Sequence, residues 1–340
     1  MNKVDREYCY LLKEILDYGR YKQSRAGETI SLFGKSMRFN LQEGLPLLTT
    51  KRVFYKGIIH ELLWFLNGET NIKYLVENNV HIWDDDAYRW YCTLSKEYEE
   101  IPYNKETFLK FVLLGSTHKF GEKEYTYGDL GPVYGKQWRN YGNSGFDQIQ
   151  NIVDKLKNNP NDRRMMCVAF NPDVLDEVAL PPCHILFQFY TEELQPIERL
   201  AWLCEHSNGE YDEWKSTTHE KMDELNVPRY TLSCSFTMRS NDFCCGNPYN
   251  IAQYAMLTYM LCEVCNMIPG ELVYNGGDVH VYTNHIEGAK EQLSRNGSEI
   301  IPKLKFNRKV TDINDFKYED FIIEDYYPDA SIKYELNVGL

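Results

Sequence analysis

The segment NIAQYAMLTYMLCEVCNMIPG, residues 250–270, most constrains how this chain can fold. It is the longest apolar helix candidate, and Gln253, Glu263 and Asn266 interrupt it, so it does not fit a membrane span. A helix this apolar must be covered by other parts of the chain. We therefore expect a buried core helix here and no membrane-spanning segment.

The chain is large enough to bury such a helix. Its 340 residues are 43% hydrophobic and 14% aromatic, which is ample for a sizeable core. Helical and strand patterns alternate without an internal repeat or a low-complexity linker, so we expect one domain over residues 1–340. Residues 87–127, rich in Tyr, Lys and Glu, and residues 191–229, which mix acidic, Trp and polar residues, are interpreted as surface insertions.

The charge balance argues against a general nucleic-acid binder. The formal net charge is -13, and basic residues cluster only in pairs such as Arg163-Arg164. The first 20 residues lack the uninterrupted apolar core of a signal peptide, and apolar residues such as Leu12 and Ile15 instead predict an amphipathic helix. We expect a soluble, cytoplasmic protein.

The cysteines give no sign of a disulfide framework or a metal site. Ten are scattered without the paired spacing of a small secreted scaffold, so most should be reduced core residues. Cys262 and Cys265 form a CxxC pair, but their apolar helical context offers no second pair and no nearby histidine. His280 and His285 are also a poor metal pair. We expect no bound metal.

The motif LPPCHILFQFY places one thiol where a corner meets a strand. Pro181 and Pro182 fix the backbone, and the apolar run from Ile185 predicts a strand, so Cys183 stands at the rim of this element. His184 is poorly placed as a base for this thiol, because neighbouring strand residues point to opposite faces. Arginines from the NDRRMM and FTMRSNDF contexts could favour a thiolate instead. From these residues alone, the cysteine could be a nucleophile or a structural thiol.

Glu61 lies among apolar residues in a segment of helical spacing, on one face with Trp64 and Phe65. Burial disfavours the charged form, which predicts a raised pKa and a candidate for proton handling near neutral pH. The alternative is a capping or ion-paired glutamate at a helix margin.

The stretch RSNDFCCGNPYN, residues 239–250, combines side chains that suit a binding site. Arg239 and Ser240 can hold phosphate oxygens, and Asp242 can accept hydrogen bonds from an amidine or a ring nitrogen. Asn250 carries a donor and an acceptor on one amide; its alternative role is a helix cap.

Together these motifs resemble the thymidylate synthase family, part of a wider group that also contains the pyrimidine-nucleotide hydroxymethylases. The resemblance covers nearly everything except the two insertions and the short N-terminal helix, and so many ordered matches are highly specific. It runs through LPLLTTKRVFYKGIIHELLWFLNGETN, NNVHIWD, GDLGPVYGKQWRNYG, NPNDRRMMCVAFNP, LPPCHILFQFY, RSNDFCCGNPYNIAQYA and GGDVHVYTNHIE.

The resemblance implies an α+β fold with a large mixed β-sheet flanked by helices, one face of which forms a homodimer interface. It also implies that Cys183 adds to carbon 6 of the uracil of deoxyuridylate (dUMP). The cosubstrate would be 5,10-methylenetetrahydrofolate, which supplies both the carbon and the hydride and leaves as dihydrofolate. The expected nucleotide product is thymidylate (dTMP), and no metal takes part.

The resemblance assigns roles to individual residues. Glu61 and Tyr134 would organise proton transfer, and Asn250 would favour dUMP over deoxycytidylate because one carboxamide matches the donor and acceptor of the uracil edge. Arg239 would also lower the pKa of the thiol. The implied catalytic residues are Cys183, Glu61, Tyr134, Asn250 and Asp242. The implied substrate-binding residues are Arg25, Arg163, Arg164, His184, Gln188, Arg239, Ser240, Asn250, His280 and Tyr282, with Arg163 and Arg164 reaching in from the neighbouring subunit. The implied folate-binding residues are Trp83, Leu180, Asp242 and Gly246.

The chain departs from the family pattern at several positions. The motif SRAGET places Arg25 one position late in the N-terminal phosphate loop. Asp86 stands where a second Trp is usual, Met238 where a Gln is common, and Cys245 where a Leu is common. The C-terminal tail has an extension after Val338.

These departures leave alternatives to the synthase reaction. The family's tail excludes water while a reactive methylene awaits hydride. If exclusion fails, the products would be 5-hydroxymethyl-dUMP and tetrahydrofolate. A third possibility is a catalytically silent homologue that binds a nucleotide, and the retained chemistry-bearing residues count against it.

Overall fold

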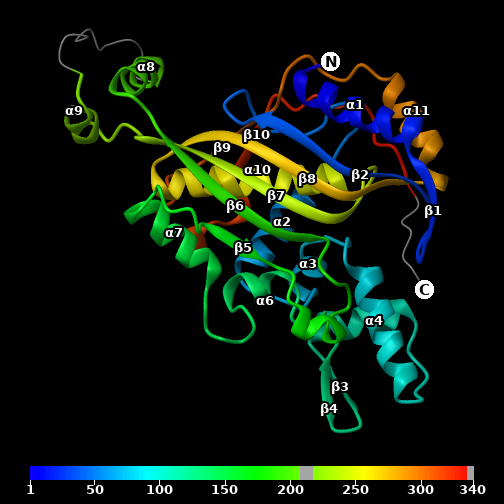
Figure 1. The fold of residues 1–340 in the computed structure, drawn as a ribbon. Helices are drawn as coiled ribbons and strands as arrows, with labels where there is room; N and C mark the ends of the chain where they lie inside the picture. Colours follow the sequence, from blue (N-terminus) through cyan, green and yellow to red (C-terminus); the bar gives the residue numbers. More distant parts are fainter. Residues whose placement is uncertain (207–216, 335–340) are drawn as a thin grey trace.

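The computed structural model describes residues 1–206 and 217–334. Its centre is a six-stranded sheet in the order β1-β2-β8-β7-β6-β5 (Figure 1). β7 (Tyr230–Asp242) and β8 (Ile268–Tyr282) are parallel, whereas the other neighbours are antiparallel. The expected large mixed sheet flanked by helices is therefore confirmed. The other strands are β1 (Arg20–Ser24), β2 (Gly27–Asn40), β5 (Met166–Val168) and β6 (His184–Glu193).

The long apolar segment forms α10 (Gly246–Cys265), which connects the two parallel strands. It is buried along most of its length, and it packs on β7, on β8 and on α2 (Tyr55–Leu66). The predicted core helix is confirmed, but it begins at Gly246 rather than at Asn250, and residues from Ile268 onward belong to β8. Apolar content alone could not mark this boundary because both elements are buried. No helix in the described residues is long and apolar enough to cross a membrane.

The alternation of side chains gives the sheet two different faces. The inner face packs against α10, which in turn contacts α2, whereas the outer face is partly exposed, with Tyr190 62% exposed. One cross-strand row on the inner face consists of Cys167, Phe187, Phe236, Tyr274 and Met37, all buried. The adjacent row on the outer face consists of Met166, Gln188, Ser235, Val273 and Arg38, none of which is fully buried.

The two proposed insertions differ in how they are packed. Residues 87–127 contain most of α4 (Asp84–Glu97), α5 (Lys105–Leu114) and a β-hairpin, and their buried aromatic residues join the main core. Residues 191–229 include the end of β6 and then α8 (Pro196–His206) and α9 (His219–Glu224), which extend away from the body (Figure 1). A small core of Leu200, Met222 and Val227 lies within this second segment. Their status as insertions on a single domain stays a prediction.

The remaining elements surround the sheet and α2. They are α3 (Lys73–Glu77), β3 (Thr117–Phe120), β4 (Lys123–Thr126), α6 (Tyr134–Arg139), α7 (Gln148–Asn158), α11 (Ile286–Ser294), β9 (Lys303–Phe306) and β10 (Phe321–Glu324).

The predicted N-terminal helix is confirmed as α1 (Lys3–Tyr18), and a buried carboxylate joins it to distant parts of the chain. Asp5 accepts hydrogen bonds from the backbone N–H and the hydroxyl groups of Thr49 and Thr50, at 2.6–3.1 Å. Thr50 in turn accepts a hydrogen bond from Gln292 in α11, at 3.0 Å. Because these groups are buried, each donor depends on this one carboxylate for its partner.

Replacing Asp5 with Asn should therefore destabilise the protein strongly. The Asp5→Asn variant keeps the shape but turns one acceptor oxygen into a donor that faces other donors, and we expect a loss of about 2–4 kcal/mol in the free energy of unfolding. Chemical denaturation monitored by circular dichroism measures this. The matched control is Asp17→Asn in the same helix, where an exposed pair with Lys13 should contribute little. Equal effects of the two substitutions would contradict the structural role assigned to Asp5.

Candidate active site

The ends of several strands meet at one edge of the sheet. Because β7 and β8 are parallel, their carboxyl ends lie together, and antiparallel β6 begins at the same edge. Asp242 pairs with His280 across these ends, and the Arg239 N–H donates to the Cys183 carbonyl at 2.8 Å. This edge therefore brings together Cys183, Arg239, Ser240, Asp242, His280 and Tyr282.

Arg239 locks the proline corner that precedes β6. Its Nε and Nη2 donate to the carbonyls of Pro182 and Pro181, both at 2.8 Å, and Nη2 lies 3.8 Å from the Cys183 Sγ. The Cys183 N–H donates to the Tyr134 hydroxyl at 2.7 Å. As predicted, the thiol lies at the rim of a strand, because Cys183 immediately precedes β6. The Arg239 guanidinium lies beside its sulfur, and hydrogen bonds with Tyr134 and Arg239 fix its backbone.

Burial sets the net pKa of the Cys183 thiol. Desolvation raises this pKa above its ordinary value, the positive charge of Arg239 opposes the shift, and the negative charge of Asp86 adds to it. Arg239 therefore lowers the thiol pKa as expected, but burial outweighs this effect and the net pKa is raised. The sequence shows which charged groups are present, but it does not show how far folding removes the thiol from water.

His184 lies in the core beneath the cysteine. Its ring stacks on Tyr134 with centroids 4.0 Å apart, and Nδ1 lies 2.6 Å from the Tyr254 hydroxyl. Burial lowers the pKa of this histidine to about 3, so the imidazole is neutral and a weak base. This agrees with the prediction that His184 does not act as a base for Cys183. Its role as a substrate ligand stays a prediction.

Glu61 is a buried carboxyl group held by two neutral donors. The Trp83 Nε1 donates to its Oε1 at 2.6 Å, and the Gln253 Nε2 donates to its Oε2 at 2.7 Å. Desolvation raises the pKa of Glu61 to about 7, although both hydrogen bonds lower it. The predicted raised pKa is therefore found. The alternative of a capping or ion-paired residue at a helix margin is wrong, because Glu61 lies inside α2 and these partners are uncharged.

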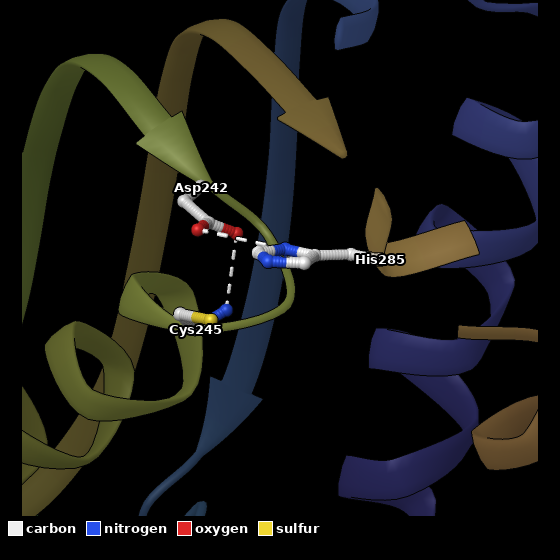
Figure 2. Close-up of side chains that lie close together, drawn as sticks. All are labelled: Asp242, Cys245 and His285. Atoms are coloured by element: carbon white, nitrogen blue, oxygen red, sulfur yellow. Dashed lines mark hydrogen bonds and ion pairs between the residues drawn. The ribbon is translucent and has the colours of Figure 1, made fainter. Parts of the chain in front are cut away.

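Asp242 is fixed by the turn that leads into α10. Its Oδ1 accepts hydrogen bonds from the N–H groups of Cys244 and Cys245, at 3.0 and 3.1 Å. Its Oδ2 lies 3.9 Å from the Nδ1 of His285 (Figure 2). The carboxylate is partly exposed, so it can both hold its orientation and accept hydrogen bonds from a bound molecule.

Asn250 belongs to a network of amides. Its Oδ1 accepts a hydrogen bond from the Asn241 Nδ2 at 3.3 Å, and the Asn241 Oδ1 accepts from the Asn247 Nδ2 at 2.5 Å and the Tyr274 hydroxyl at 2.9 Å. The N-cap of α10 is Cys245, so the alternative of Asn250 as a helix cap is wrong. The carboxamide lies one turn further along and is oriented by side chains from β7 and β8.

The remaining predicted ligands near this edge come from four parts of the chain. His280 is buried with its Nδ1 3.1 Å from the Asp278 Oδ1, and its ring meets that of Tyr282 edge-on. Arg25 is exposed in the turn between β1 and β2, close enough for its charge to lower the pKa of Tyr282 against the dominant effect of burial. Leu180 precedes the proline corner and Gly246 is the first residue of α10.

Three predicted substrate ligands lie elsewhere in the chain. Arg163 and Arg164 are exposed just before β5, and Met166 pairs with Gln188. The Gln188 Nε2 donates to the Arg163 carbonyl at 3.4 Å. At roughly 3.3 Å per strand residue, Gln188 lies about 16 Å along the sheet from Cys183. The structure therefore does not bring these three residues to the thiol of their own chain.

Comparisons with known proteins agree with this geometry. The sequence profile of the family described as Thymidylate synthase matches residues 6–338. The chain belongs to the thymidylate synthase family. It is 40% identical to the thymidylate synthase of Malacoplasma penetrans over 331 residues, covering 96% of this chain and 98% of the relative. The thymidylate synthase of Francisella tularensis subsp. holarctica is 38% identical over 347 residues, covering 98% of this chain and all of the relative.

The departures from the family pattern can be located in the structure. Asp86 lies in the first turn of α4, where it forms an ion pair with Arg89. Met238 is buried in β7, and Cys245 is partly buried just before α10. The extension after Val338 lies outside the described residues.

Several residues that organise this family member's site were missed by sequence reasoning. Gln253 holds Glu61, Tyr254 holds His184, and Asn241 orients Asn250. The sequence does contain a signal for Gln253. It is a polar side chain in an apolar helix and lies three residues after Asn250, on the same helical face. Asn241 offered no comparable signal, since its role depends on contacts between β7 and α10.

The raised pKa of Glu61 predicts a specific pH dependence of stability. The folded-state pKa of about 7 lies above the unfolded value of about 4.3, so the folded protein binds this proton more tightly. The corresponding stability is present below about pH 4 and is lost as the pH rises through 7. Relative to Glu61→Gln, the wild-type protein should lose about 3 kcal/mol over this window.

Urea denaturation between pH 5 and pH 8 measures this difference. The control is Glu122→Gln, at an exposed position in the β3–β4 hairpin, which should follow the wild-type pH dependence. Parallel curves for the wild type and Glu61→Gln would show that the carboxyl group has an ordinary pKa.

Proposed function

We propose that this protein is a methyltransferase that converts dUMP to dTMP. The observation that carries the proposal is a single thiol, Cys183, at the strand edge where Arg239, Asp242 and Asn250 converge, in a chain of the thymidylate synthase family. The cosubstrate 5,10-methylenetetrahydrofolate supplies the one-carbon unit and the hydride that reduces it, and dihydrofolate is released. The relatives named thymidylate synthase support this reaction.

Cys183 acts as the nucleophile that adds to carbon 6 of the uracil ring. Addition of sulfur at carbon 6 makes carbon 5 electron-rich, which divides one difficult substitution into easier steps. The burial that raises the thiol pKa also strengthens its attraction to Arg239, because charges interact more strongly where water is excluded. Arg239 therefore stabilises the thiolate as it forms, and its contacts with two proline carbonyls keep it in place.

Glu61 and Tyr134 handle protons beneath the ring. A carboxyl group with a pKa of about 7 is present in both protonation states near neutral pH, so Glu61 can accept a proton and return it. Its donors Trp83 and Gln253 fix both oxygens. Tyr134 binds the backbone of Cys183 and stacks on His184, which connects the nucleophile to the buried groups.

Substrate choice follows from polar groups that are already oriented. The carboxamide of Asn250 can donate to a uracil carbonyl and accept from the ring N–H, whereas cytosine presents the opposite pattern. His280 and Tyr282 at the end of β8 bind the ribose, and Ser240 and Arg25 bind the phosphate. For the folate, Asp242 offers a carboxylate to the nitrogen-rich ring, and Trp83, Leu180 and Gly246 supply the adjoining surface.

We infer that the active unit is a homodimer. Arg163, Arg164 and Gln188 are too far from Cys183 in their own chain to complete its phosphate site, but they lie beside the outer face of the sheet. That face is partly exposed over Tyr190, Ser235 and other residues. A two-fold contact between two such faces would carry each arginine pair toward the partner's thiol. A cytoplasmic location remains a prediction from the sequence.

Product analysis tests the proposed reaction. Incubation with dUMP and 5,10-methylenetetrahydrofolate should give dTMP and dihydrofolate in equal amounts, as measured by chromatography with mass detection. The Cys183→Ala variant should form neither product, because it lacks the thiol that adds to carbon 6. Formation of 5-hydroxymethyl-dUMP with tetrahydrofolate would instead identify the hydroxymethylase reaction of the wider group.

Complementation tests the exchange of arginines between subunits. The double variant Arg163→Ala, Arg164→Ala and the variant Cys183→Ala should each be almost inactive. After they are unfolded and refolded together, heterodimers would contain one site with both the thiol and the partner's arginines. Random pairing then predicts roughly a quarter of wild-type activity. If the arginines act within their own chain, no activity should return, and the matched mixture of Cys183→Ala with wild type controls for refolding yield.

A further inference from the structure

Three metal-ligating side chains converge beside the proposed folate position. Asp242 ends β7, Cys245 precedes α10, and His285 comes from the turn after β8 (Figure 2). Asp242 offers a carboxylate oxygen, Cys245 offers its Sγ and His285 offers a ring nitrogen. These three atoms all lie within 4.8 Å of one another. Among residues 1–206 and 217–334, no other group of this kind is present.

We propose that Asp242, Cys245 and His285 form a Zn²⁺ site that inhibits the enzyme by occupying the folate position. Thiolate and imidazole ligands suit zinc, whereas magnesium and calcium prefer oxygen ligands. Three protein ligands leave the fourth tetrahedral position for water. The ion is an inhibitory ligand and takes no part in methyl transfer.

The spacing of the ligand atoms fits zinc after a small adjustment. Zinc bonds of about 2.0–2.3 Å place tetrahedral ligand atoms roughly 3.3–3.8 Å apart. The longest separation here is within 4.8 Å, and the Oδ2 of Asp242 is 3.9 Å from the Nδ1 of His285. A shift of about 1 Å therefore completes the site. Asp242 and Cys245 are partly exposed, so they can make this shift and an ion can reach them.

Neighbouring groups hold two of the ligands in orientation. The Oδ1 of Asp242 accepts two backbone hydrogen bonds, which turns its Oδ2 toward His285. The buried ring of His285 lies against Tyr282 and Tyr334, with centroids 5.5 and 4.9 Å away. Such surrounding contacts fix the geometry of metal ligands and strengthen metal binding.

The charges balance when zinc binds. The thiol of Cys245 gives up its proton to solvent, an S–Zn bond replaces the S–H bond, and the thiolate and carboxylate together neutralise the divalent ion. Burial and the nearby carboxylate raise the pKa of the Cys245 thiol, so zinc must compete with this proton. The buried cation of Lys51, whose field reaches Asp242 and Cys245, also works against the ion. These two effects limit the affinity without changing the ligand set.

The inhibitory part of this inference rests on the proposed function, in which Asp242 binds the folate. One carboxylate oxygen cannot serve zinc and the folate ring together, so zinc should compete with 5,10-methylenetetrahydrofolate and not with dUMP. Cys245 stands where the family commonly has Leu, which lacks a ligand atom. The zinc sensitivity should therefore disappear when Leu is restored.

Metal binding is tested first, without turnover. Co²⁺ serves as the probe because a cobalt–thiolate bond absorbs in the near ultraviolet, and Zn²⁺ should displace it. The full-length protein and a Cys265→Ser control should bind one Co²⁺ with this absorption. Cys245→Ser and Cys245→Leu should lose it and bind Zn²⁺ at least ~10-fold more weakly by calorimetry. Unchanged absorption in both variants, each with wild-type near-ultraviolet circular dichroism, would overturn the site.

Inhibition is tested second. Zn²⁺ should raise the KM for 5,10-methylenetetrahydrofolate in the wild type while leaving kcat at saturating folate unchanged, and Cys245→Leu should resist it. If cobalt and zinc bind as described but inhibition does not follow, the metal site stands and its overlap with the folate is wrong. If no dTMP forms under any condition, the proposed function fails, whereas the cobalt result still tests the site.

Discussion

The structure depends on covering α10, a helix that is apolar on nearly every side. It crosses between two adjacent parallel strands, so one of its sides lies on β7 and β8, while α2 covers another. The same connection places the carboxyl ends of both strands at one edge, with the first turns of α10 directly beside them. Asp242, Asn250, His280 and Tyr282 are neighbours for this reason. The need to bury one helix thus determines where the polar groups of the candidate site gather.

Desolvation outweighs nearby charge at three buried groups of this site. It raises the pKa of Cys183 and Glu61 and lowers that of His184, and in each case it favours the uncharged form. Neutral hydrogen-bond donors then fix Glu61 without ion pairs. Of these groups, Glu61 is close to the balance between its protonation states near neutral pH. A charge that develops on a substrate is felt strongly in such a site because little water screens it.

Individual elements could be predicted from local pattern, whereas the large mixed sheet was expected from the resemblance to the family. The core helix, the amphipathic first helix and the strand after Cys183 each follow from the spacing of apolar residues. The candidate site was less predictable, because Glu61 depends on Trp83 and Gln253, which are distant in sequence, and the thiol pKa depends on burial as well as on Arg239. The sequence was compatible with Asn250 as a helix cap, because apolar content does not show that α10 begins at Gly246, before Asn250. Only tertiary packing supplies this information.

The pairing of β2 with β8 has a consequence for how the molecule forms. Asn40 pairs with Glu271 and Thr29 with Tyr282. β2 therefore cannot form this pairing until β8, which lies most of the chain's length further along the sequence, is available. On the ribosome, β2 would emerge long before its partner and would expose an unpaired edge in the meantime. Contacts of such long range slow folding. We therefore expect acquisition of the sheet to be a late event, completed only when nearly the whole polypeptide has been synthesised.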